Sequence, residues 1–187
     1  EPKSQQRRGI YLLPNLFTTA GLFAGFYAIV GAMQGQFNMA AIAIFIALVT
    51  DGLDGRIARL TNTASAFGAQ YDSLSDMVAF GVAPALLMYL FVGHEFGRFG
   101  IVASALFVIF GAIRLARFNV MTVSSEPSVF IGVPIPTAAV FVSLLVLLFH
   151  KYGFNADYGL VIILLSILVS LLMVSNIRYP SFKKVDL

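Results

Sequence analysis

Residues 51–76 read DGLDGRIARLTNTASAFGAQYDSLSD and hold four of the nine acidic residues of this 187-residue chain. The four are Asp51, Asp54, Asp72 and Asp76. The chain around them is 59% hydrophobic, and carboxylates beside apolar helices are unfavourable unless another group compensates their charge. The stretch therefore predicts a functional site.

Two antiparallel helices joined by a turn would bring the four aspartates together. Asp51 and Asp54 are three residues apart and share one face of a helix, while Gly68, Asp72 and Asp76 step by four along one face of the next. The small polar residues 61–65, TNTAS, predict the turn. With a rise of ~1.5 Å per residue, all four carboxylates fall within about 7 Å along the helix axes.

Four like charges at this spacing require cations between them. Oxygen ligands without histidine or cysteine favour Mg²⁺ or Mn²⁺, and two divalent ions held by shared carboxylates are a plausible fit. The alternative is that Arg56 and Arg59 pair with the aspartates at a helix end. Two arginines cannot neutralise four carboxylates, so the metal site is the favoured interpretation.

The composition is that of an integral membrane protein. The mean hydropathy is +0.89 and only 11% of the residues are charged, which excludes a water-soluble globule. The chain has no cysteine, so it has neither disulfides nor thiol chemistry. Its net charge is +3, but the basic residues flank apolar spans and form no continuous patch, which argues against a nucleic-acid partner.

The hydropathy pattern predicts an all-α membrane protein with six transmembrane helices, at about residues 12–33, 37–60, 66–92, 98–118, 136–150 and 158–177. With both termini in the cytosol, ten of the twelve basic residues lie inside, and only Arg98 and Lys151 lie outside. The aspartates then open to the cytosol, in a cytoplasmic membrane of prokaryotic type.

We divide the chain into a basic juxtamembrane segment (1–11), a six-helix catalytic domain (12–177) and a cytosolic tail (178–187). The first segment starts EPKSQQRR, which is not a secretory signal. Residues 121–134 are expected to form a cytosolic loop.

The acidic stretch resembles the signature of the CDP-alcohol phosphotransferases. The matching pattern is Asp51-x-x-Asp54-Gly55-x-x-Ala58-Arg59, then eight residues, then Gly68-x-x-x-Asp72-x-x-x-Asp76. Softer motifs are similar to segments of the membrane-bound phosphatidylserine synthases, and they lie at residues 13–15, 75–84, 111–119, 130–136 and 177–180. The resemblance implies a six-helix membrane fold of the CDP-alcohol phosphotransferase type, a homodimer and two divalent ions.

The resemblance also implies roles for the signature residues. The four aspartates would surround the metals, Asp72 and Asp76 would act in catalysis, and Asp76 would be the base that takes the proton of the alcohol. The nucleotide would be held by Asp54, Gly55, Ala58, Arg59 and Gly68. Small residues permit a close approach of the nucleotide, and an arginine binds phosphate.

Four further pairs of polar or basic residues lie outside the signature. Asn15 and Thr18 could reach the nucleotide or a metal, or form a polar cap at a helix N-terminus. Arg114 and Arg117 could bind the serine carboxylate or a substrate phosphate, or be charges that fix the membrane orientation, with Arg114 slightly favoured. His94 and His150 fall on the outer side and receive no role. Arg7 and Arg8 are expected to meet anionic membrane lipids.

The implied activity is transfer of a phosphatidyl group from CDP-diacylglycerol to the hydroxyl of L-serine, with release of CMP. One alternative is a related enzyme that uses glycerol 3-phosphate or inositol phosphate as the alcohol, or an archaeal lipid as the donor. The other is a divalent-cation transporter, which would need polar residues along a path to the outer face. The outer halves of the expected helices carry no acidic residue.

Overall fold

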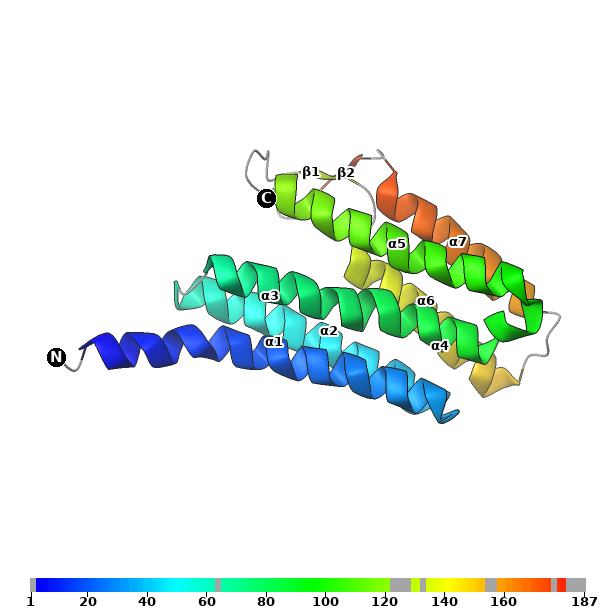
Figure 1. Ribbon diagram of the computed structural model, residues 1–187, viewed down its shortest axis with the longest axis horizontal. Helices are drawn as coiled ribbons and strands as arrows, with labels where there is room; N and C mark the ends of the chain where they lie inside the picture. Colours follow the sequence, from blue (N-terminus) through cyan, green and yellow to red (C-terminus); the bar gives the residue numbers. More distant parts are fainter. Residues whose placement is uncertain are drawn as a thin grey trace, which may run out of the picture.

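The computed structural model describes residues 3–62, 65–121, 129–131, 134–153, 158–175 and 178–180. Its elements, in chain order, are α1 (Lys3–Met33), α2 (Phe37–Leu60), α3 (Ala66–Asp76), the π-helical segment η1 (Met77–Val82), α4 (Ala83–Phe91), the short 3₁₀ helix η2 (Gly93–Phe96), α5 (Arg98–Met121), β1 (Val129–Ile131), α6 (Ile135–Tyr152), α7 (Gly159–Val174) and β2 (Arg178–Pro180). The long helices lie side by side along one direction (Figure 1).

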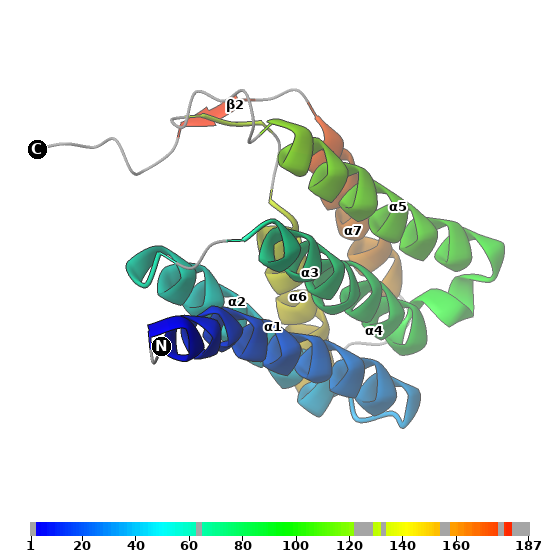
Figure 2. The ribbon, with the colours of Figure 1, turned by 60° about the vertical axis from the view of Figure 1, so that its left-hand side comes forward.

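The helices form a bundle in which some close neighbours, such as α5 and α7, are not consecutive along the chain. Helix α1 packs mainly against α2, and α5 packs mainly against α7. Figure 2 shows these two pairs on opposite sides of the molecule, with α4 and α6 between them. The acidic stretch lies on α2 and α3, so it occupies one end of the bundle, which we call the acidic end.

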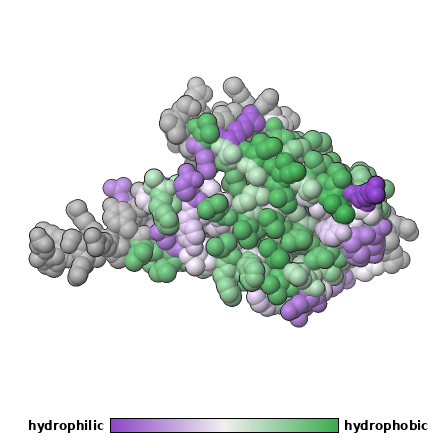
Figure 3. Space-filling view, viewed as in Figure 1, coloured by the Kyte–Doolittle hydropathy of each residue, from purple (hydrophilic) through white to green (hydrophobic). Residues whose placement is uncertain are grey.

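Within the described part of the chain, five helical stretches are long and apolar enough to cross a membrane: Leu12–Met33, Phe37–Leu60, Ala66–Phe91, Arg98–Val120 and Ile135–Tyr152. Helix α7 is apolar but only 16 residues long. Large apolar side chains cover the visible flank of the bundle, and hydrophilic residues gather toward its ends (Figure 3). The predicted all-helical membrane architecture is therefore confirmed, whereas the six-span count and the orientation stay predictions.

Helix α1 begins at Lys3, well before the predicted start near residue 12. Asn15 and Thr18 consequently lie in the middle of a helix, and the interpretation of these two residues as an N-terminal cap is wrong. Pro14 lies inside α1, although proline is unfavourable within a helix. The apolar pattern, which starts near residue 12, did not predict that the helix extends back to Lys3.

Small residues let the helices of the acidic end approach closely. A Cβ atom built on Gly25 would lie 2.7 Å from the Cα atom of Ala79, and one built on Gly21 would lie 2.9 Å from the hydroxyl of Thr50. Such contacts between small residues are the usual means of tight helix packing in membranes. They press α1 against both α2 and η1, which are the elements that flank the acidic stretch.

The helix that carries Asp72 and Asp76 changes its winding directly after Asp76. Through η1 the turns are wider, and the N–H of Ala83 donates to the carbonyl of Val78, five residues back. Pro84 follows and lacks the N–H that an α-helix would bond to the carbonyl of Phe80. The sequence predicted one continuous helix here and did not predict the π-helical turns.

A short antiparallel strand pair joins two segments that are distant in sequence. In it Val129 pairs with Pro180, and Ile131 pairs with Arg178. The predicted loop at residues 121–134 therefore contains β1, but its stretch at residues 122–128 lies outside the described residues. Most of the predicted tail, residues 181–187, also lies outside them.

Candidate functional site

Helices α2 and α3 bring three of the four predicted aspartates into one cluster. One carboxylate oxygen from each of Asp51, Asp72 and Asp76 lies within 4.8 Å of the other two. The turn between the helices passes through Asn62, whose φ of 53° is left-handed, a conformation that asparagine tolerates. Ser65 then starts α3 as its N-cap and accepts a hydrogen bond from the N–H of Gly68 at 3.0 Å.

Asp54 lies beside this cluster and is held by helix α1. The hydroxyl of Thr18 donates to Asp54 Oδ2 at 2.7 Å, and both side chains are buried. Asp54 is also close enough to Asp72 for a direct interaction. The four carboxylates thus form a continuous group, in which Asp54 alone has a hydroxyl partner from α1.

Arginine does not compensate these charges. Among the described residues, the side chains that act on the four aspartates are other aspartates and Thr18. Arg56 is exposed, and Nε of Arg59 donates to the carbonyl of Gly55 at 3.2 Å. The alternative in which Arg56 and Arg59 pair with the aspartates does not hold in the structure.

The cluster fits a hard divalent cation. Among the residues that the structure describes, Oδ1 of Asp72 has no hydrogen-bond partner although it is buried, and an isolated buried carboxylate oxygen is strongly unfavourable. Three carboxylates within 4.8 Å, with no histidine or cysteine among them, form a donor set suited to Mg²⁺ or Mn²⁺. A cation would satisfy the unpartnered oxygen and reduce the repulsion between the carboxylates.

A pocket of about 160 Å³ opens beside the cluster between α1, α2 and α3. Its lining includes seven residues that the sequence singled out: Asn15, Thr18, Asp54, Gly55, Ala58, Gly68 and Asp72. Three further lining residues, Pro14, Ser65 and Ala69, were not predicted. Ser65 could have been found, because a serine before an apolar helix is a typical N-cap.

Arg59 does not line this pocket and lies beside it. It is exposed, and its Nη2 is 4.0 Å from the position that a Cβ atom on Gly55 would take. Its guanidinium is therefore next to Gly55, which lines the pocket.

The structure separates the two arginines of α5. Arg114 is buried, whereas Nη1 of Arg117 donates to the carbonyl of Val174, at the last residue of α7. A cation at the C-terminus of a helix is electrostatically favourable, so Arg117 holds α5 to α7. Neither arginine lines the pocket between α1, α2 and α3.

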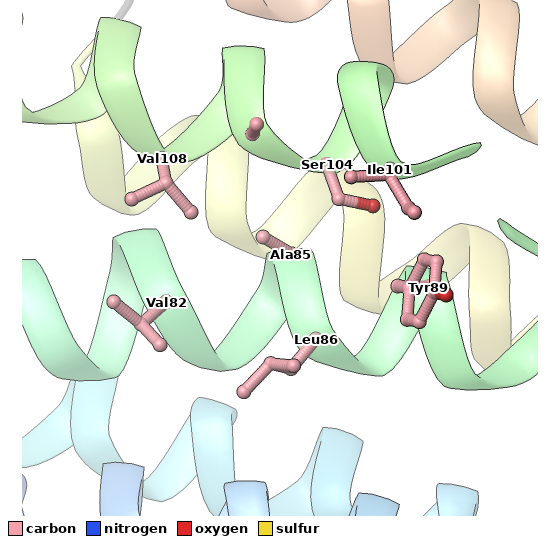
Figure 4. Close-up of a pocket in the computed structure, with 8 residues that line it drawn as sticks. Val82, Ala85, Leu86, Tyr89, Ile101, Ser104 and Val108 are labelled. Carbon is pink, nitrogen blue, oxygen red and sulfur yellow. The ribbon is translucent and has the colours of Figure 1, made fainter. Parts of the chain in front are cut away.

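A larger cavity of about 320 Å³ lies between α4 and α5, and its lining is almost entirely apolar. Figure 4 shows side chains such as Val82, Leu86 and Val108 around it, with Tyr89 at one end. Its described lining residues include no acidic or basic side chain. Asp54 and Asp72 of the acidic group line the smaller pocket instead.

His150 lies at the end of the bundle opposite the aspartates. Its Nδ1 is 3.1 Å from Oδ1 of Asn38, which is in the first turn of α2. His94 contacts the carbonyl of Tyr89 at 3.2 Å, near the end of α4. Neither histidine adjoins the acidic cluster.

A sequence profile of the CDP-alcohol phosphatidyltransferase family matches residues 11–173. This chain belongs to that family. Because the matched region contains the helices long enough to cross a membrane, the protein is an integral membrane protein. The family generally uses divalent metals, in agreement with the donor set of the acidic cluster.

Curated relatives match over most of their length. The CDP-diacylglycerol–serine O-phosphatidyltransferase of Helicobacter pylori is 56% identical over 94% of this chain and 75% of its own length. The archaetidylserine synthase of Methanothermobacter thermautotrophicus is 38% identical over 90% of this chain and 69% of its own length. The CDP-diacylglycerol–serine O-phosphatidyltransferase of Bacillus subtilis is 33% identical over 92% of each chain.

Proposed function

We infer that this protein transfers a phosphatidyl group from CDP-diacylglycerol to the hydroxyl of L-serine and releases CMP. The observation that carries this conclusion is the 56% identity over 94% of the chain to a relative of that activity. The geometry agrees with it, because an acidic cluster adjoins a pocket lined by small residues. All three relatives described above carry serine in their names, which favours serine as the acceptor.

The proposal assigns two divalent ions, Mg²⁺ or Mn²⁺, to Asp51, Asp54, Asp72 and Asp76. Such ions, when bound, neutralise charge on the pyrophosphate and orient its phosphorus for in-line attack. The hydroxyl of Thr18 fixes one oxygen of Asp54, so the ligand geometry at that position is set by α1. The unpartnered oxygen of Asp72 supports its assignment as a ligand.

The proposal places the cytidine diphosphate in the pocket between α1, α2 and α3. Gly55, Ala58 and Gly68 have small or no side chains and so leave space for the nucleotide. Asn15 contributes an amide that can form hydrogen bonds with it. A Cβ atom on Gly68 would lie 3.0 Å from Ser65 Oγ and 3.5 Å from Asn15 Oδ1, so any larger side chain there would fill the opening. Arg59, next to Gly55, would reach a phosphate from the edge.

Gly55→Ala is expected to raise the KM for CDP-diacylglycerol at least about tenfold, because one methyl group intrudes on the bound nucleotide. The protein itself has space for this methyl group, since only Arg59 Nη2 comes within 4.0 Å of it. Alanine also favours the helix by about 1 kcal/mol over glycine. The measurement is CMP release at varied CDP-diacylglycerol concentration.

Gly52→Ala is the matched control for this variant. Gly52 is on the same helix, is exposed, and has nothing within 4 Å of the added carbon. We expect its KM to equal that of the wild type. Equal KM values for Gly55→Ala and Gly52→Ala would remove Gly55 from the nucleotide site.

The alcohol is proposed to bind between α3 and α5, on the other side of the acidic cluster from the nucleotide. Asn119 is hydrogen-bonded to Ser73, and a Cβ atom on Gly111 would lie 4.0 Å from the Cα atom of Gly81. These two contacts are eight residues apart on α5 and also along the continuous stretch of α3 and η1. Helix α5 packs against η1 and α4 and runs antiparallel to them (Figure 1). Arg114, three residues from Gly111, is therefore level with the residues directly after Asp76.

Arg114 is accordingly proposed to bind the serine carboxylate, and Arg117 to anchor α5 on α7. Arg114→Lys keeps the charge but loses the planar fork that matches a carboxylate. We expect the KM for serine to rise about tenfold, while the KM for CDP-diacylglycerol stays within about twofold. Serine-dependent CMP release by the purified variant measures both constants, and an unchanged KM for serine with normal folding would exclude Arg114 from the serine site.

The finer features of membrane organisation are part of the same proposal. Ten of twelve basic residues fall on the side of the acidic end if all six apolar helices cross the membrane. We therefore propose six spans with both termini in the cytosol, a cytosolic active site in a cytoplasmic membrane of prokaryotic type, and a homodimeric assembly. Labelling of single cysteines in this cysteine-free chain, from either side of sealed vesicles, tests the orientation.

The choice of substrates is tested by CMP release from purified protein with each pair of donor and alcohol. Serine, glycerol 3-phosphate and inositol phosphate are compared with CDP-diacylglycerol, and serine is then compared with a CDP-linked archaeal ether lipid. The second donor is a specific alternative because one relative is named archaetidylserine synthase. Release of CMP with glycerol 3-phosphate or inositol phosphate and none with serine would reject the proposed acceptor. The cation-transporter alternative is not retained, since the chain belongs to an enzyme family.

A further inference from the structure

A pair of polar side chains joins the helix of Asp72 and Asp76 to the helix of Arg114. Nδ2 of Asn119 donates to Oγ of Ser73 at 2.9 Å, and Ser73 Oγ is also 3.3 Å from Asn119 Oδ1. The same hydroxyl lies 3.1 Å from the carbonyl of Ala69, one turn back on α3. Both side chains are partly buried in a bundle whose surroundings are apolar, where polar contacts between helices gain importance.

The position of this pair is set by the residues on either side of it. Ser73 follows Asp72 directly and precedes Asp76 by three residues on the same helix. A shift of α3 at Ser73 would therefore also move both aspartates. Asn119 is two residues beyond Arg117, whose guanidinium holds the same end of α5 to α7. The end of α5 is therefore attached to α7 on one side and to α3 on the other.

We propose that the Ser73–Asn119 pair is a positioning contact that sets the separation of α3 and α5 and thereby presents the alcohol, in preference to water, to the reacting phosphorus. This inference rests on the proposed function, in which the alcohol binds between these two helices. The pair does not touch the reacting atoms. It fixes the distance between Arg114 on α5 and the carboxylate of Asp76 on α3.

The competing reaction gives this proposal a readout of its own. When water replaces serine, its oxygen bonds to the phosphorus attached to diacylglycerol, the phosphoanhydride bond breaks, and CMP leaves. The base takes a proton from water as it would from serine, and the products are phosphatidate and CMP. A looser gap between α3 and α5 lowers the occupancy of serine and admits water, so the ratio of phosphatidate to phosphatidylserine reports on positioning.

The experiment compares Ser73→Ala, Asn119→Ala and the double variant with the wild type, using CDP-diacylglycerol, Mn²⁺ and varied serine. Each single variant is expected to raise the KM for serine about fivefold, leave the KM for CDP-diacylglycerol within about twofold, and raise the phosphatidate fraction. The double variant is expected to match the single variants, because both members of one contact are lost together. Ser73→Thr keeps the hydroxyl and is expected to restore the product ratio.

Ser104→Ala is the matched control. Ser104 is on α5, and its hydroxyl donates within that helix to the carbonyl of Gly100 at 3.0 Å. Its product ratio is expected to equal that of the wild type. Should Asn119→Ala fail to fold, Ser73→Ala, which removes a single oxygen atom, decides the question together with Ser73→Thr.

Two results would overturn the positioning role. One is a fall in turnover with an unchanged product ratio and an unchanged KM for serine in folded protein. The other is a double variant whose effects are the product of the single effects. If the wild type used another alcohol, serine would be rejected as the acceptor, but the role of the Ser73–Asn119 pair would not. The ratio of phosphatidate to the product of that alcohol would then test the positioning role.

Discussion

Asp76→Asn is expected to lower turnover with serine by ~10² to 10⁴, the contribution typical of a general base in a transition state. The amide has nearly the shape of the carboxylate, so the variant removes the proton acceptor and one charge while it keeps the packing. Asp76 is the right candidate because it lies in the cluster with Asp51 and Asp72 and is level with the residues proposed to receive the alcohol. The measurement is incorporation of serine into lipid at saturating substrate and metal.

At saturating metal, the same variant is expected to bind CDP-diacylglycerol with an affinity near that of the wild type. The amide oxygen of asparagine can still coordinate an ion, and the described lining of the pocket proposed for the nucleotide does not include residue 76. Glu95→Gln is the control for a lost acidic charge, since Glu95 is exposed on η2 after the far end of α4. Near-normal turnover of Asp76→Asn, with intact donor binding, would reject its assignment as the base.

The helices were the most predictable part of the structure, because apolar spans and turn residues are local signals. Residues 37–60 were predicted as a helix and α2 has those bounds. The start of α1 was missed because its first residues are polar and basic. Apolar periodicity detects only those parts of a helix that contain apolar residues. The strand pair β1–β2 was missed because it depends on a contact between residues 129–131 and 178–180.

The clustering of the aspartates could be predicted from their spacing. Once the turn is located, the distance of each residue from it sets its level along two antiparallel helices. Spacing along α2 could not show that Asp54 turns toward Thr18, since that contact comes from α1. It also could not separate Arg114 from Arg117, which are three residues apart with the same chemistry. Their difference involves α7, because the carbonyl of its last residue, Val174, accepts a hydrogen bond from Arg117, whereas Arg114 is buried.

Asp51→Asn is expected to lower serine transfer at least about a hundredfold at ordinary metal concentration, since even groups that only support a metal ligand contribute 10–100-fold. It is also expected to raise the concentration of Mn²⁺ needed for half-maximal activity. Chelation of divalent ions should abolish transfer by the wild type, and added Mn²⁺ or Mg²⁺ should restore it. The measurement is phosphatidylserine formation over a titration of each ion.

Thermal unfolding separates the metal interpretation of the cluster from a purely structural one. In chelator, the wild type holds three carboxylates within 4.8 Å without a cation, and like charges at that distance oppose folding. Asp51→Asn removes one of them, so its Tm in chelator is expected to exceed that of the wild type by about 2–4 °C, the shift that ~1 kcal/mol produces in a chain of this size.

With saturating Mn²⁺ the order of the two Tm values is expected to reverse. The wild type gains binding free energy from the ion, whereas the variant has lost one ligand and gains less. Glu95→Gln, with no carboxylate partner in the cluster, should follow the wild type in both conditions. A Tm of the wild type that does not respond to Mg²⁺, Mn²⁺ or chelator would mean that the aspartates are stable together without a cation, and the assignment of the site would fail with it.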